Sequence, residues 1–103
     1  PLTNKYSKNI FWVFGVVIRK NSKIKRDQIV EKLKRMNIET RNFFHPMHKQ
    51  KIFRKMKIFS RKVKFQNAEY LSRNGFYLPS GLGIKNSQIH YVAKSLNKLL
   101  KNY

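Results

Sequence analysis

The chain has 103 residues, enough for one small domain with a modest hydrophobic core. It contains no cysteine, which excludes disulfides and thiolate metal sites and is compatible with a reducing cytoplasm, where we expect the protein to be. Lysine and arginine number 24 against four acidic residues, so the formal charge is +20. The longest apolar run, Ile10 to Ile18, is far shorter than the ~20 residues that span a bilayer, so no membrane contact is expected.

The positive charge has two explanations. A strongly basic chain is typical of proteins that bind nucleic acid or anionic surfaces. The basic residues are spread along the chain, however, and Lys, Asn, Ile, Phe and Tyr are all plentiful, as expected from an AT-rich coding sequence. A dedicated binding patch would be clustered. We therefore favour a compositional bias, and a small basic nucleic-acid-binding domain is the alternative.

The first third of the chain predicts a connector, a strand and a helix. Residues 1–9 are polar, and their start without an initiator methionine suits a fragment of a longer protein. Ile10 to Ile18 is rich in aromatic and β-branched residues, which predicts a strand buried on both faces or nearly so. Arg26 to Met36 carries an apolar stripe of helical period, and Asn37 is a suitable C-terminal stop for that helix.

The middle of the chain predicts a second strand and a short helical segment. Ile38 to Phe44 reads as the strand, and Pro46 ends it because proline has no N–H to give a sheet ladder. Residues 49–64 read as a short helix and a loop that packs on a partner surface. The alternative for this segment is a basic, aromatic-interleaved nucleic-acid site, which requires its phenylalanines to lie in solvent.

The last third predicts a helix, a short strand and a final helix. Phe65 to Asn74 reads as the first helix, ended by Gly75 in the left-handed conformation. Phe76 to Leu78 reads as the third strand. Asn86 or Ser87 is a suitable N-terminal cap for the last helix. Three strands with helices packed on one face predict a small two-layer α+β domain over residues 1–103.

One stretch of the chain resembles a known family. Thr40-Arg41, Phe43-Phe44 and Pro46-Met47-His48 look like the C-terminal domain of the pyridoxal-phosphate-dependent sugar-nucleotide aminotransferases, the perosamine synthetase-like, DegT-type group. Ala68-Glu69 and Leu78 to Leu82 agree with the same family in order and spacing. The resemblance spans nearly the whole chain, which would be only the last third or quarter of such an enzyme.

The resemblance implies a function for the longer enzyme. That enzyme would be a transferase that moves an amino group, typically from glutamate, to a keto nucleotide sugar for surface polysaccharide or O-antigen. It implies pyridoxal phosphate as cofactor and a homodimer, with the fold of the C-terminal domain of fold-type I pyridoxal-phosphate enzymes. The Schiff-base lysine and most of the phosphate cup would lie in the large N-terminal domain. No catalytic or cofactor-binding residue is therefore expected in this chain, and the isolated fragment should be inactive.

Three residues are candidate substrate-binding residues, namely Arg41, His45 and His48. By resemblance, the loop after the second strand faces the active-site cleft, and His48 matches the family's histidine after the proline. Arg41 offers a planar fork suited to a phosphate or sugar oxygen. The alternatives are a salt bridge of Arg41 with Glu39 or the large domain, and a structural hydrogen bond for His48. His45 stands where the family often has tyrosine.

Two further possibilities follow from what the residues offer. A metal site built from His45, His48 and His90 lacks a nearby carboxylate or cysteine as a further ligand, so none is predicted. A structural domain with no site of its own is the remaining rival to the enzyme and nucleic-acid hypotheses.

Overall fold

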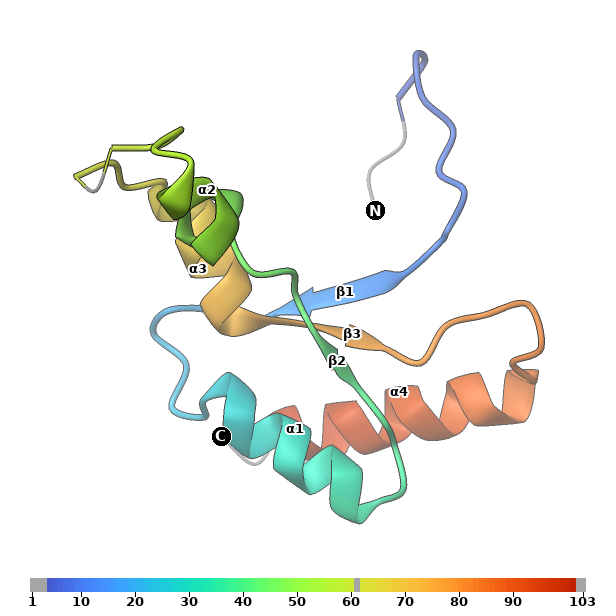
Figure 1. The fold of residues 1–103 in the computed structure, drawn as a ribbon. Coiled ribbons are helices and arrows are strands. Elements are labelled where there is room, and N and C mark those ends of the chain that lie inside the picture. The colour runs from blue at the N-terminus through green and yellow to red at the C-terminus, as the bar shows by residue number, and fades with distance from the viewer. Residues whose placement is uncertain (1–3, 61, 102–103) are drawn as a thin grey trace.

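The fold is a three-stranded antiparallel sheet with helices, shown in Figure 1 for a computed structural model that describes residues 4–60 and 62–101. The elements follow in the order β1 (Phe14–Val17), α1 (Arg26–Arg35), β2 (Arg41–Asn42), the 3-10 helix η1 (Met47–Lys49), α2 (Lys51–Lys55), α3 (Gln66–Asn74), β3 (Gly75–Leu78) and α4 (Asn86–Lys101). The predicted order of elements and the α+β class are confirmed. Residues 1–3 of the predicted connector lie outside the described residues.

The last strand in the chain is the central strand of the sheet. β3 pairs antiparallel with β1 on one side and with β2 on the other. Tyr77 of β3 lies opposite Gly15 of β1 and Arg41 of β2. Direct partners of this kind share one face of a sheet. The next position along, Phe76, therefore points to the opposite face together with Asn42.

The core lies between the Phe76 face of the sheet and the pair of helices α1 and α4 (Figure 1). The helices α1 and α4 supply half of the buried hydrophobic residues, and Ile29 and Leu33 of the stripe predicted for α1 are fully buried. The buried hydrophobic residues are Ile18, Ile24, Ile29, Leu33, Ile38, Phe76, Leu78, Val92, Leu96 and Leu99. Burial of such side chains stabilises a fold by about 1.5–3 kcal/mol each.

The ends of α1 follow local hydrogen-bond rules. Gln28 accepts a hydrogen bond from the backbone N–H of Lys25 at 2.8 Å, which satisfies one donor at the start of the helix. Asn37 has a positive φ of 57°, and the N–H of Ile38 returns to the carbonyl of Leu33 at 2.9 Å. This left-handed ending is the stop that the sequence predicted at Asn37.

The start of α4 corrects one prediction. Asn86 and Ser87 lie inside the helix and not at its cap, because α4 begins at Asn86. The N–H of Lys85 donates instead to the side chain of Gln88 at 2.9 Å. A glutamine three residues into the helix therefore does at α4 what Gln28 does at α1.

The predicted first strand is too long, and most of it is exposed, although Ile18 at its end lies in the core. Only Phe14–Val17 pairs, and β1 is an edge strand with β3 as its sole neighbour in the described sheet. Ile10 is 84% exposed, and Phe11 and Trp12 are each 68% exposed. A continuous apolar run predicts burial, but it does not say whether the covering partner is part of the same chain.

The predicted second strand, Ile38 to Phe44, is also too long. The ladder of β2 holds only Arg41–Asn42, extended by a hydrogen bond from the N–H of Phe43 to the carbonyl of Gly75 at 3.4 Å. β3 offers four positions and β1 pairs with all of them, whereas β2 pairs only with Phe76 and Tyr77. Ile38 contributes to the core from just before the strand.

Gly75 is needed for space and not for a left-handed turn, which corrects another prediction. Its φ of −100° and ψ of 148° are extended, so α3 runs directly into β3. A Cβ atom at this position would collide with the ring of Phe43 and would lie 2.6 Å from the carbonyl oxygen of Leu71. At Gly15 of β1, a Cβ would lie 2.9 Å from the same Phe43 ring. Phe43 therefore lies across two glycines on neighbouring strands.

We expect Gly75→Ala to lower the free energy of unfolding by about 1–3 kcal/mol, because the new methyl group has to displace a backbone carbonyl and a packed ring. Gly81→Ala is the matched control, since a Cβ at Gly81 meets no atom within 4 Å. Urea unfolding followed by circular dichroism measures both. Equal losses for the two variants would show that the space at Gly75 is not the constraint.

Candidate functional site on the open face of the sheet

The face of the sheet opposite α1 and α4 is open. The α2–α3 lobe rises at one end of this face, and the N-terminal segment before β1 rises at the other (Figure 1). A hollow of about 520 Å³ lies at this face beside β2. Its lining residues are Trp12, Val13, Glu39, Arg41, Asn42, Phe44, Tyr77, Leu78, Pro79, Ser80 and Gly81.

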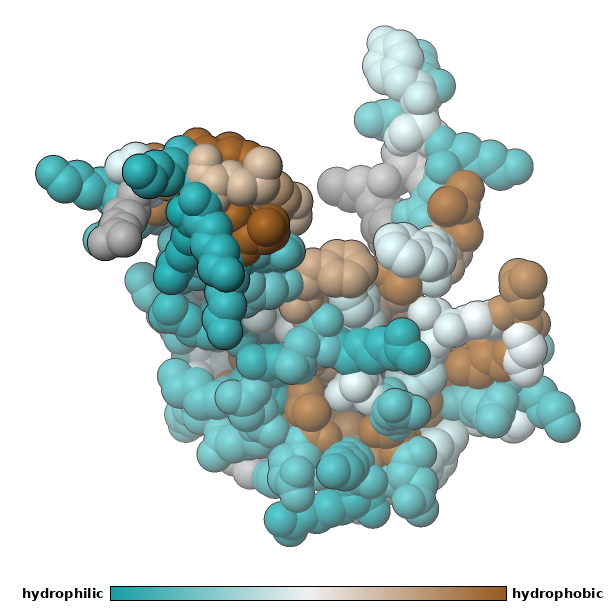
Figure 2. All heavy atoms as spheres, viewed as in Figure 1, coloured by the Kyte–Doolittle hydropathy of each residue, from teal (hydrophilic) through white to brown (hydrophobic). Residues whose placement is uncertain are grey.

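Aromatic rings dominate the open face. Phe43 stacks on Tyr77 with ring centroids 4.5 Å apart, and Phe44 lies 6.0 Å from the same tyrosine ring. Phe44 is 70% exposed. Figure 2 shows hydrophobic residues on the α2–α3 lobe and on the N-terminal segment, whereas the region around α1 is mainly hydrophilic. Exposed aromatic surface of this kind marks a ligand-binding or protein-binding face.

Arg41 is exposed and lies in this hollow. Within residues 4–60 and 62–101, no ion pair joins it to Glu39, although both residues line the same space. Its guanidinium is therefore available to an anion or to a hydroxyl-rich ligand.

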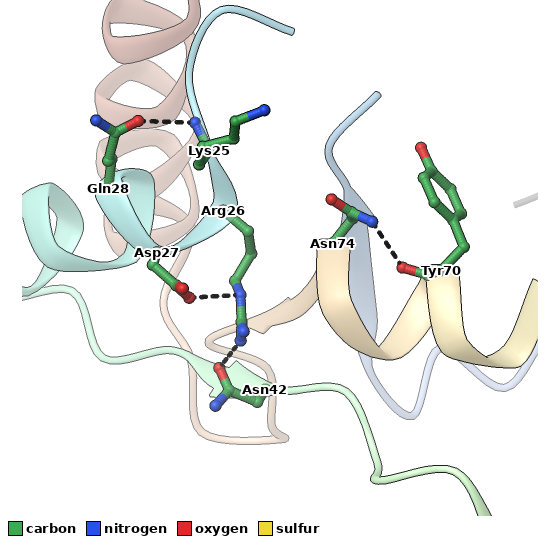
Figure 3. A network of polar contacts seen from close by, with 7 residues as sticks. All are labelled: Lys25, Arg26, Asp27, Gln28, Asn42, Tyr70 and Asn74. Carbon is green, nitrogen blue, oxygen red and sulfur yellow. Dashed lines mark hydrogen bonds and ion pairs between the residues drawn. The ribbon is translucent and has the colours of Figure 1, made fainter. Parts of the chain in front are cut away.

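The neighbouring residue in β2 fixes the backbone that carries Arg41. Arg26, the first residue of α1, donates from Nη1 to the side-chain oxygen of Asn42, and its Nε lies 2.8 Å from Asp27 (Figure 3). The same view shows Asn74 donating to the carbonyl of Tyr70 at 2.9 Å near the end of α3. These contacts tie β2 to the helical layer and close the last turn of α3.

His48 lies elsewhere, in a small second core. It is 8% exposed, and its Nε2 lies 3.0 Å from Oε1 of Glu69 in the first turn of α3. The ring of Phe65 is 4.9 Å from the imidazole, and that of Phe59 is 6.4 Å away. This geometry holds η1 against α3.

Glu69 is the charged centre of that second core. Its Oε2 lies 2.5 Å from Nζ of Lys49. The hydrogen bonds from Lys49 and then from His48 lower the pKa of Glu69 from 4.5 to about 2. The carboxylate is therefore ionised at neutral pH and accepts from two successive residues of η1.

The structure does not bring the three predicted site residues together. Arg41 lies in the hollow on the sheet, and His48 lines a separate pocket between α2 and α3. His45 is exposed on the link between β2 and η1. The sequence did not single out Trp12 or Tyr77 as companions of Arg41. The strand register supplies the missing signal for Tyr77, because Arg41 pairs directly with it.

The phenylalanines of the basic segment pack on one another. Phe53 meets Phe59 edge to face at 6.2 Å, and Phe59 meets Phe65 in the same manner at 6.0 Å. Phe53 and Phe59 are half-buried, so their rings do not form the open stacking platform that the nucleic-acid alternative requires. Arg61 of this segment lies outside the described residues.

The residues present do not fit pyridoxal phosphate on their own. The cofactor needs a lysine for its covalent link and a carboxylate at its ring nitrogen. The hollow that holds Arg41 has Glu39 but no lysine among its described lining residues. Glu69 is already bound to Lys49 and His48. The described residues likewise contain no group of three or more histidine or acidic side chains that could hold a metal ion.

The described helices have at most 16 residues. None of them is long and apolar enough to cross a bilayer. The fold matches that of an aminotransferase of Helicobacter pylori, PseC, which is involved in the biosynthesis of pseudoaminic acid, with a TM-score of 0.73 and 13% sequence identity. The match covers 88% of this chain and 24% of that one. The fold is therefore one found as part of an aminotransferase.

Residues 1–97 match the DegT/DnrJ/EryC1/StrS aminotransferase family, and the chain belongs to this family. It is 28% identical over 93 residues to a GDP-perosamine synthase of Caulobacter vibrioides and 32% identical over 99 residues to one of Escherichia coli O157:H7. These matches cover 90% and 92% of this chain, but only 24% and 25% of the relatives. The predicted resemblance to this family is confirmed, and the chain spans about a quarter of the length of these relatives.

Glu69→Gln should change how stability depends on pH. Because the folded pKa of Glu69 is lowered, its contribution is fully present above pH 4.5 and is lost as the pH falls toward about 2. The wild-type free energy of unfolding should therefore fall more steeply across this window than that of the variant. Urea unfolding at a series of pH values measures the two slopes.

Glu31→Gln serves as the control, because Glu31 forms an exposed pair with Arg35 one helical turn away. Such pairs contribute about 0.3–0.5 kcal/mol. If Glu31→Gln flattens the acid slope as much as Glu69→Gln does, the Glu69 cluster does not control acid stability.

Proposed function

We propose that this chain is the C-terminal small domain of a pyridoxal-phosphate-dependent aminotransferase that acts on a keto nucleotide sugar. The observation that carries the proposal is the family match over residues 1–97. The curated relatives are named GDP-perosamine synthase, and the chain spans about a quarter of their length. The Schiff-base lysine and the cofactor cup belong, in this proposal, to the large N-terminal domain of the same enzyme, which acts as a homodimer.

The open face of the sheet supports a covering partner. Trp12 and Phe44 are 68% and 70% exposed, and both line the hollow. Large aromatic side chains that are exposed together mark a surface that another domain or protein covers. In the proposed enzyme the large domain covers this face. The hollow at Arg41 then becomes part of the cleft between the two domains, where a nucleotide sugar binds.

The three predicted substrate-binding residues take different roles in this proposal. Arg41 is exposed in the hollow, so it binds the diphosphate or a hydroxyl of the substrate. His45 is exposed on the loop that leaves β2, and in this proposal it contacts the substrate from the edge of the same cleft. His48 is held by Glu69, so its contribution is to position the loop that carries His45.

In the full-length enzyme, Arg41→Ala should weaken transition-state binding by about 2–4 kcal/mol, as expected when one charge-assisted partner is lost. Arg41→Lys should recover little, because the bidentate fork is lost. The measurement is kcat/KM for the keto sugar beside thermal stability. Arg73→Ala is a control that removes an exposed arginine from α3, and it should leave kcat/KM unchanged.

His48→Ala should reduce activity less than Arg41→Ala, should leave cofactor binding intact and should lower thermal stability, because it leaves Glu69 with one partner fewer. If Arg41→Ala also loses stability in proportion to activity, Arg41 is structural and the site assignment is wrong.

The isolated chain should neither transaminate nor hold pyridoxal phosphate at one lysine, and it should tend to associate through its exposed aromatic face. Borohydride reduction in the presence of the cofactor, followed by peptide mapping, tests this expectation. A stoichiometric adduct at a single lysine would place the catalytic machinery in this chain and would contradict the proposed division of the enzyme.

A further inference from the structure

We propose a second binding site, for the phosphate group of a small phosphorylated molecule, in the pocket between α2 and α3. This pocket has a volume of about 510 Å³ and lies apart from the hollow that holds Arg41. Its lining residues are His48, Lys49, Arg54, Phe59, Ser60, Val63, Lys64 and Glu69. The proposal does not depend on the proposed enzymatic function.

Three segments of the chain form the walls of the phosphate pocket. Lys49 and Arg54 come from η1 and α2, Ser60 and Lys64 from the following loop, and Glu69 from α3. The packed rings of Phe59 and Phe65 support the pocket from the side of His48. An apolar wall lowers the local dielectric constant, which strengthens the attraction between the nearby cations and an anion.

Two cations of the pocket remain available to a ligand after the ion pairs within the pocket are counted. Glu69 is satisfied by His48 at 3.0 Å and by Lys49 at 2.5 Å. Arg54 and Lys64 have no ion-pair partner among the described residues. A planar guanidinium, an ammonium and a nearby hydroxyl form a donor set that matches the several oxygens of a phosphate or diphosphate.

The hydroxyl group of Ser60 is able to donate its proton to this ligand. The N–H of Lys62 donates to Oγ of Ser60 at 3.3 Å, so the hydroxyl oxygen acts as an acceptor toward the protein. A hydroxyl carries one proton that it can donate in addition. Ser60 therefore adds a neutral donor to the pocket that the two unpaired cations also line.

The volume of the pocket and the packing of the nearby aromatic rings favour a small molecule over a nucleic-acid strand. Its volume falls in the range of small-molecule sites, roughly 300–1,000 Å³. A strand of nucleic acid needs open aromatic faces for its bases, and Phe53, Phe59 and Phe65 here use their rings on one another. The cations Lys94 and Lys98 of α4 line another hollow, of about 590 Å³, whose described lining contains no arginine and no phenylalanine, and they provide the comparison.

The experiment is a titration of the chain with inorganic pyrophosphate and with a nucleoside diphosphate at physiological ionic strength. Calorimetry gives the affinity, and amide chemical shifts locate the site. Arg54→Gln combined with Lys64→Gln should weaken binding of both probes at least about tenfold, because two charge-assisted partners are lost. Lys94→Gln combined with Lys98→Gln removes the same charge elsewhere and should change the affinity less than about twofold.

Three results would overturn the proposal. The first is equal weakening by the two double variants, which would mean that general positive charge attracts the probes. The second is the absence of saturable shifts at residues 48–69. The third is tighter binding at this pocket of a single-stranded oligonucleotide than of the nucleoside diphosphate, which would assign the pocket to a nucleic-acid backbone. Ser60→Ala, which keeps both cations, should weaken binding by a smaller factor if the hydroxyl donates as proposed.

Discussion

The packing of Phe43 across the sheet is the contact on which the rest of the structure depends. Its ring occupies the space that side chains at Gly15 and Gly75 would fill, and it stacks on Tyr77. Because Gly75 has no side chain, α3 can end and β3 can begin without an intervening loop. That junction sets the position of the central strand, and the central strand sets the register of both neighbours.

The side chains of the central strand alternate between the buried face and the open face of the sheet. Phe76 and Leu78 of β3 are buried against α1 and α4, whereas Tyr77 points to the open side beside Arg41. The α2–α3 lobe is organised separately around the ionised Glu69. The helical layer therefore supplies stability, and the open face and the lobe keep polar and aromatic groups accessible.

Much of the fold could be predicted from the sequence because the helices have regular periods. The stripe of α1 and the stop at Asn37 are local features, and both are found where they were expected. The extent of β1 and β2 could not be predicted, because it depends on pairing with β3, which lies far away in the sequence. The role of Gly75 was missed in part for the same reason, since the ring of Phe43, one of the two groups that exclude a side chain there, is remote in the sequence.

The candidate site could be predicted in part. Arg41 was proposed from its neighbours in the chain, and the structure places it, exposed, in a hollow. The separation of Arg41 from His48 could not be foreseen, because η1 turns the chain toward Glu69. Glu69 follows His48 by 21 positions, so no local pattern links the two.

The uneven distribution of charge and apolar surface has a consequence for how copies of this chain meet. Two molecules that approach through their aromatic faces bring two charges of +20 together. At low ionic strength that repulsion keeps them apart, and dissolved salt shortens its range to about 10 Å at 0.1 M. Dilute buffer therefore opposes self-association of the chain, and added salt favours it. The same screening weakens the attraction of the chain to anions, so salt promotes one kind of contact and reduces the other.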